Sequence, residues 1–171
     1  MTEEVDFLIQ RIRDEYGVSS LPTGTTAVGS EPPLEIVDRD DAEFESGRRS
    51  RSGELTQANI VSIASVDDDT TAIGTAYDHS VERICGVRIE GLHHSEWGHI
   101  DPDGRKGAPW RSLVRIVRRA ILRARGYPDP GTPDIGYTNL RLVNGVDQSQ
   151  NYGDYYRYDV DVIFDGFERL P

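Results

Sequence analysis

The residues best equipped for chemistry gather in one short segment near the middle of the chain. It places three histidines and three acidic residues within eleven positions, namely His93, His94, Glu96, His99, Asp101 and Asp103. Imidazole and carboxylate groups are the ligands that Zn²⁺ or Mn²⁺ would take. Their spacing matches no established metal motif, and the sequence contains no His-Glu-x-x-His. We therefore expect a polar loop without a metal, and a small metal-dependent hydrolase is the alternative.

Nucleophilic catalysis has less support in the sequence. No serine lies in a Gly-x-Ser-x-Gly pattern, and the chain has a single cysteine, Cys85. Cys85 falls among apolar neighbours in a predicted strand, so we expect a buried thiol and no internal disulfide. The sequence thus predicts a protein that is not an enzyme and carries no cofactor.

Arginines form a second concentration of functional groups, opposite the apolar side of a predicted helix. They are Arg111, Arg115, Arg118, Arg119, Arg123 and Arg125. Three roles stay open: ion pairs with acids of the same chain, contact with an acidic surface of another subunit, or phosphate contacts with nucleic acid. The candidate interface consists of the first five, together with Arg48, Arg49, Arg51, Tyr155 and Arg157. The cluster at 48–51 is also explained as a solvated loop tip.

Two helices and several strands must position these groups. Apolar spacing predicts a helix from Thr2 to Tyr16, with Val5, Leu8, Ile9, Ile12 and Tyr16 buried. A second helix opens at Pro109 and ends at Gly126. Alternation and β-branched residues predict strands at 34–37, 55–65, 70–77, 81–92, 139–143 and 156–164, with a turn at Asp67–Asp69.

This order of elements predicts the fold class. Strands that follow one another in the sequence favour antiparallel pairing, and the helices are too few to cover both faces of a parallel sheet. We expect one α+β domain over residues 1–171, with a mostly antiparallel sheet and two helices packed on one face. Mobile loops are expected at about 18–33, 38–53 and 144–153.

The composition indicates a protein adapted to high salt. Thirty acidic residues face nineteen basic ones, giving a net charge of -11, and Lys106 is the only lysine. At about 1 M salt the Debye length is roughly 3 Å, so a dense carboxylate surface no longer repels itself. The acidic balance argues against broad nucleic-acid binding. With no signal peptide or membrane span in the sequence, we expect the protein to be made in the cytoplasm.

The element order and the ending YYRYDVDVIFDGFERLP together resemble the tail terminator, or tail-completion, proteins of long-tailed viruses. The salt-adapted composition makes the chain look like one from a virus of a halophilic archaeon. The resemblance implies a homo-hexameric ring in the virion, between the tail tube protein and the neck or head–tail connector proteins. It also implies that genome DNA passes through the lumen without specific binding. A nucleic-acid-binding accessory protein that uses the arginine-rich helix is a further alternative.

Overall fold

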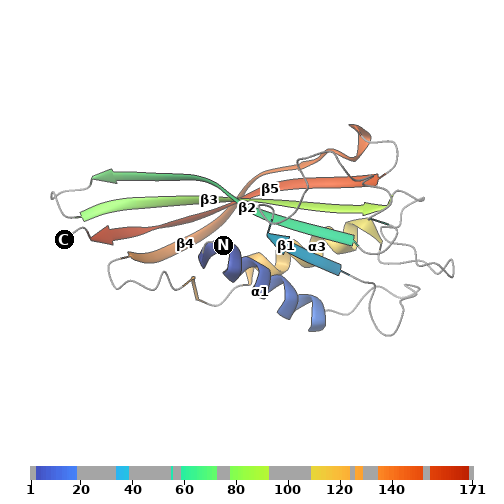
Figure 1. Ribbon diagram of the computed structural model, residues 1–171, viewed down its shortest axis with the longest axis horizontal. Helices are drawn as coiled ribbons and strands as arrows, with labels where there is room; N and C mark the ends of the chain where they lie inside the picture. The colour runs from blue at the N-terminus through green and yellow to red at the C-terminus, as the bar shows by residue number, and fades with distance from the viewer. Residues whose placement is uncertain are drawn as a thin grey trace.

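The protein is a twisted sheet with two helices beside it (Figure 1). This computed structural model describes residues 3–18, 34–38, 55, 59–72, 78–92, 109–123, 126–128, 135–151 and 155–169. The helices are α1 (Glu3–Val18) and α3 (Trp110–Leu122), with a short 3-10 helix, η2, at Ser149–Asn151. The strands are β1 (Leu34–Asp38), β2 (Asn59–Ala72), β3 (Asp78–Leu92), β4 (Ile135–Asp147) and β5 (Tyr155–Arg169).

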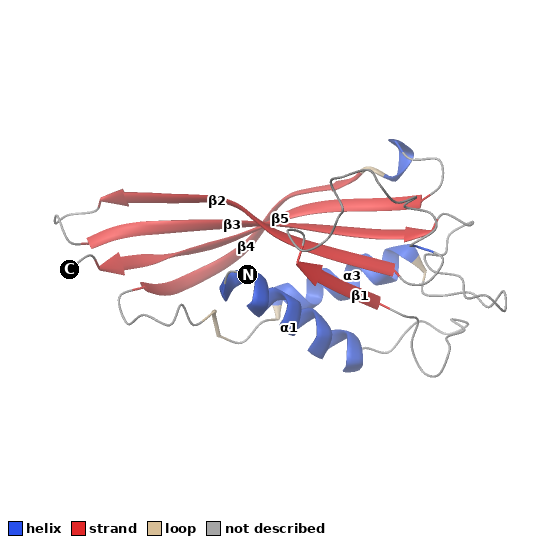
Figure 2. Cartoon of the chain, in the orientation of Figure 1, coloured by secondary structure: helices blue, strands red, loops and turns tan. Residues whose placement is uncertain are grey.

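The sheet has five strands in the order β1-β2-β3-β5-β4. Antiparallel pairing joins β2 to β3, β3 to β5 and β5 to β4, whereas the short β1 runs parallel to β2. The predicted α+β class and the mostly antiparallel sheet are therefore confirmed. Figure 2 shows that one end of β2, β3, β5 and β4 continues past the helices. We call the end of the sheet that is formed by the paired residues 67–72, 78–84, 135–141 and 163–169 the distal half; Tyr137 and Phe164 within it contact α1.

One hydrophobic core joins both helices to the sheet. All five residues predicted to be buried on α1 are buried, as are Trp110, Leu113, Ile116, Val117, Ala120 and Ile121 of α3. They pack with alternate residues of the strands, including Cys85, Val160 and Phe164. The burial predicted for Cys85 is confirmed, since the residue is 1% exposed. Along the central parts of β3 and β5, every second side chain points toward the helices and is buried in the core.

The predicted turn at Asp67–Asp69 is wrong. β2 runs unbroken through these residues, and its pairing with β3 shifts register once, between Ser65 and Asp67. Aspartate is a poor strand former, but this propensity amounts to only about 1 kcal/mol or less and depends on context. Backbone pairing with Glu82–Ile84 outweighs it. The bulge at Val66 places one extra residue in β2 and changes the direction of the strand after it.

The loop predicted to begin at residue 144 starts later. β4 continues to Asp147, and Asn144 and Gly145 form a bulge within it, where Asn144 has a φ of 55°. Asparagine tolerates this left-handed conformation better than most residues do. The pair therefore bends a strand that is thirteen residues long instead of closing a turn. The second helix was predicted to end at Gly126, but it ends at Leu122, and Gly126 beyond it has a positive φ of 88°.

A buried polar contact fastens the start of α1 to β4. The Tyr137 hydroxyl donates a hydrogen bond to Glu4 Oε1, and the two residues are 8% and 7% exposed. Burial, reinforced by this bond, raises the pKa of the Tyr137 hydroxyl well above its ordinary value of 10.0. The folded protein therefore holds this proton more tightly than the unfolded chain does. The resulting stability is complete below pH 10 and is lost as the pH rises above it.

Replacing Tyr137 with phenylalanine should lower the free energy of unfolding by about 1–3 kcal/mol at neutral pH, because Glu4 stays buried and loses a donor. The variant should also lose less stability than the original protein when the pH is raised above 10. Denaturant unfolding in molar KCl at several pH values measures both effects. Tyr127→Phe is the matched control: its hydroxyl bonds the Thr138 carbonyl at 2.8 Å, but Tyr127 is 42% exposed. Equal losses in the two variants would contradict the account.

Candidate subunit interface

The outward side of α3 is a basic surface without acidic residues of its own. Arg111, Arg115 and Arg118 are exposed and follow one another at the i, i+4, i+7 spacing of one helix face. Like charges at these spacings destabilise a helix by about 0.2–0.5 kcal/mol per pair. In the described part of the chain no carboxylate forms an ion pair with any of the three. We call this surface the basic face.

The other arginines of α3 have different surroundings. Arg119 points to α1, where its Nε donates to Glu15 Oε1 at 2.6 Å, so it joins the two helices within one chain. Arg123 is exposed just beyond the helix end. Arg125 lies outside the described residues. Of the three roles left open by the sequence, pairing within the chain therefore applies to Arg119.

Arg157 belongs to an ion-pair cluster on the sheet. Its Nε donates to Asp159 Oδ2 at 2.9 Å, and Arg88 Nε donates to Asp159 Oδ1, also at 2.9 Å. The side chains of Arg88 and Arg157 are only 15% and 16% exposed. Arg157, predicted as an interface residue, is thus already paired within β5, while Arg88 links β3 to β5 through the same carboxylate. Tyr155, at the start of β5, is partly buried.

A second, more exposed cluster of ion pairs connects three strands of the distal half. Arg141 of β4 bonds Asp165 of β5 at 3.1 Å and Glu82 of β3 at 3.0 Å. Asn139 adds a hydrogen bond to Asp165 at 3.2 Å. These contacts run across strand directions, so they fix the order and register of β3, β5 and β4.

Two strand edges of the sheet are uncovered by any described strand. β4 is the last strand on one side and pairs only with β5. On the other side β1 pairs only with residues 59–63 of β2, so residues 64–72, which pair with β3, have no described partner strand on their outer side. Uncovered edges present unpaired N–H and C=O groups that can template the addition of another strand. Both open stretches reach into the distal half of the sheet.

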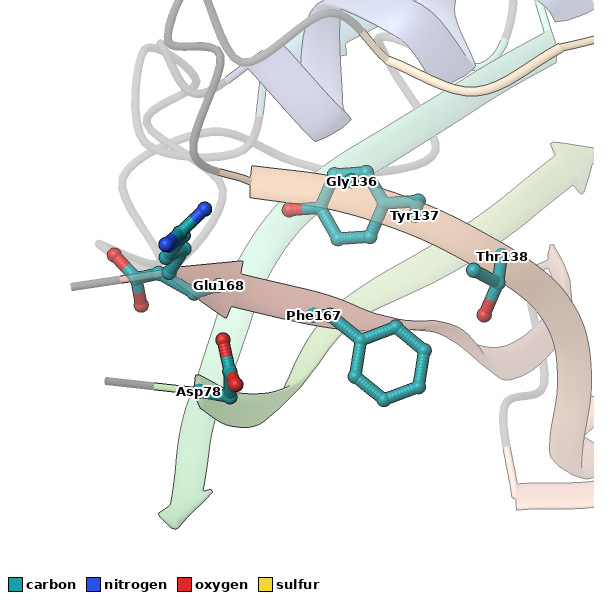
Figure 3. Close-up of a pocket in the computed structure, with 7 residues that line it drawn as sticks. Asp78, Gly136, Tyr137, Thr138, Phe167 and Glu168 are labelled. Atoms are coloured by element: carbon teal, nitrogen blue, oxygen red, sulfur yellow. The ribbon is translucent and has the colours of Figure 1, made fainter. Parts of the chain in front are cut away.

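The distal half also carries an exposed aromatic side chain beside a shallow hollow. Phe167 is 52% exposed, and the hollow of about 530 Å³ next to it is lined by residues of β3, β4 and β5 (Figure 3). Gly136, level with Phe167 in register, contributes no side chain, and a methyl group there would meet no atom within 4 Å. A smaller hollow of about 280 Å³ borders Phe167 as well. The space is open to solvent, and Phe167 provides an apolar surface that another protein could contact.

Several predicted site residues lie outside the described residues. These are Arg48, Arg49, Arg51, His93, His94, Glu96, His99, Asp101 and Asp103. Among the residues that are described, no group of three His, Cys, Asp or Glu side chains could hold a metal ion. Neither described helix has the length and apolar run needed to span a bilayer.

Comparison with known proteins adds no identification. The sequence matches no protein-family model and no curated protein.

Sequence reasoning missed the two open edges and Phe167. Which strands lie at the edges depends on the order of the strands in the sheet. No single segment of the sequence determines that order. Phe167 did carry a signal: it follows Phe164 by three positions and so falls out of phase with the alternating core residues of β5.

Proposed function

We propose that this chain is a structural virion protein that forms a ring at the head-proximal end of a viral tail. The ring would terminate the tail tube and join it to the neck. The observation that carries this proposal is the pair of open edges on opposite sides of one sheet. A surface used by copies to contact one another, without any reaction to perform, accounts for these edges and for the basic face.

The strand directions are compatible with a ring in which the sheet continues from copy to copy. β2 and β4 run in opposite directions, because three antiparallel pairings separate them. A neighbouring copy in the same orientation would therefore bring its β2 antiparallel to β4 and continue the pattern of the sheet. Each copy would use two different edges, and such heterologous contacts produce rings when the rotation closes. Strand twist of roughly 20–25° per pair supplies rotation between copies.

An arginine and an asparagine of one edge, both already bonded to Asp165, are level with two aspartates of the other edge. Reading the register straight across the sheet, Arg141 of β4 is level with Asp67 of β2, and Asn139 is level with Asp69. Pairing of β4 with β2 of the next copy in that register would set an arginine and an amide opposite two aspartates. Opposite charges facing each other across strands stabilise a sheet by about 0.2–1 kcal/mol per pair.

The overall charge fits a ring around DNA that does not hold it. With a net charge of -11, most of the surface repels phosphate. The basic face is the exception, and a contact with acidic protein removes it from the lumen. We therefore assign the basic face to protein contacts in preference to nucleic acid.

Light scattering on the purified protein in molar KCl tests the proposal. We expect a particle of several copies, with six times 19.1 kDa as the mass that the resemblance implies. The mass should stay constant over a wide range of concentration, because a closed ring has no free end to extend. A strict monomer at high concentration would contradict the proposal, and so would a mass that grows without limit.

A further inference from the structure

We infer that the basic face of α3 docks on α1 of the next copy in the ring. The inference rests on the proposed function, because it names the second contact that accompanies pairing of the sheet edges. The partner surface is the acidic, exposed side of α1. Two independent features of the fold, the position of the helices and the sign of their charges, lead to the same arrangement.

The helices contact different edges of the sheet, except at the start of α1, where Glu4 binds Tyr137 of β4. α1 contacts β1 and β2, whereas α3 contacts β4, and the two helices pack against each other. When β4 of one copy lies beside β2 of the next, α3 of the first copy is on the side nearest to α1 of the second. The contact between sheet edges therefore brings α3 toward the part of α1 that contacts β1 and β2.

The exposed charges of the two helices have opposite signs. α3 presents Arg111, Arg115 and Arg118 and contains no acidic residue. The exposed charged residues of α1 are three acids and one arginine: Glu3, Asp6, Arg13 and Asp14. Docking on α1 of the next copy would offset the repulsion among the three arginines. No described carboxylate of the same chain forms an ion pair with them. Complementary surfaces of this kind set partner and register.

Both charged surfaces are directed away from the contact that the helices already make. Arg119 and Glu15 mark that internal contact. At 3.6 residues per turn, Arg111 and Arg118 lie about a quarter-turn from Arg119 on α3. Asp6 lies nine residues before Glu15, which is about half a turn around α1. Arg111, Arg118 and Asp6 are therefore directed toward other molecules while the intrachain pair stays formed.

The internal pair shows the chemistry expected between copies. Arg119 Nε and Glu15 Oε1 are 2.6 Å apart, joining the same two helices within one chain. At about 1 M salt charges separated by more than roughly 3 Å are screened, and direct contacts are screened less when partly buried. The forked arginine side chain can keep paired hydrogen bonds to a carboxylate. Contacts of this type suit an interface that forms in high salt.

Charge reversal of each helix tests the inference. We would make Arg111→Glu with Arg118→Glu, and separately Asp6→Arg with Asp14→Arg, and measure particle mass in molar KCl across a dilution series. Each double variant places like charges across the interface, so the dissociation constant should rise at least about 100-fold. A chain with all four substitutions restores opposite signs and should assemble within about tenfold of the original protein.

Mixing the two double variants gives a second readout that does not need the fourfold variant to fold. The acidic α3 of one variant matches the basic α1 of the other, so the mixture should assemble although neither variant does alone. Arg169→Glu, an exposed reversal at the end of β5, is the matched control and should assemble normally. Circular dichroism confirms that each variant is folded.

The outcomes separate the inference from the proposed function. An original protein that never assembles overturns the ring itself. A protein that assembles, with double variants that assemble equally well, overturns the docking of α3 on α1 and leaves the ring intact. Folded double variants that dissociate but are rescued neither by the fourfold chain nor by mixing also overturn it, because the arginines then meet a different partner.

Discussion

Gly166→Ala should destabilise this protein by about 3 kcal/mol or more and weaken the attachment of β4 to the sheet. Gly166 pairs with Tyr137, where β4 bulges. A methyl group on Gly166 would overlap the carbonyl oxygen of Gly136 and come within 2.9 Å of Tyr137 Cα. These are backbone atoms of the adjacent strand, so no side-chain rotation can relieve the overlap. The loss of β4 would also remove one of the two edges assigned to copy-to-copy contact.

Gly136→Ala is the matched control for this prediction. Gly136 lies on the same pair of strands, but an added methyl group would meet no atom within 4 Å. Its φ is not positive, so alanine should be neutral or stabilise by up to about 1 kcal/mol through the unfolded chain. Denaturant unfolding in molar KCl measures both variants. Similar stabilities for the two alanine variants would mean that β4 and β5 do not approach each other as described.

Phe164→Ala should cost about 3–5 kcal/mol, the usual range for removing a buried aromatic side chain. Phe164 is 0% exposed and lies in the core between the helices and the sheet. Its ring meets Phe7 of α1 edge-on at 6.1 Å between centroids, and Tyr137 of β4 at 5.5 Å. The substitution would leave a cavity where α1, β4 and β5 meet, and the transition in denaturant would move to a lower concentration.

Phe167→Ala provides the comparison on the same strand. Phe167 is 52% exposed on the opposite face of β5, so its loss should change the free energy of unfolding by no more than about 0.5 kcal/mol. A large loss for Phe167 together with a small one for Phe164 would show that β5 presents the other face to the core. That result would reverse the assignment of every residue on the strand.

Periodicity predicted the helices and the central strands because burial has a fixed repeat in each. Every residue of α1 that was predicted to be buried is buried. In β5 the alternation is borne out at Tyr158, Val160, Val162 and Phe164, which are all buried. Strand ends and bulges were harder to predict. Asp67–Asp69 and Asn144-Gly145 have the composition of turns, yet pairing with a long neighbouring strand keeps them extended.

The candidate interface was predictable only in part. The arginine spacing placed the basic face correctly on one side of α3, since helical geometry follows directly from sequence. Arg119 binds Glu15, which is 104 residues away in the sequence, so this pair could not be predicted from helical spacing. Arg157 binds Asp159, two residues further along the same strand. The open edges follow from strand order, which the sequence did not determine. The histidine-rich segment lies outside the described residues, so its role stays a prediction.

Electron microscopy of the purified protein in molar KCl would show whether the copies close into a ring. We expect closed rings with a central opening, in which neighbouring copies meet through β4 on one side and β2 on the other. Single copies, two-fold dimers or open filaments as the main particle would each contradict this expectation, because none of them uses two different edges of the sheet in a closed assembly.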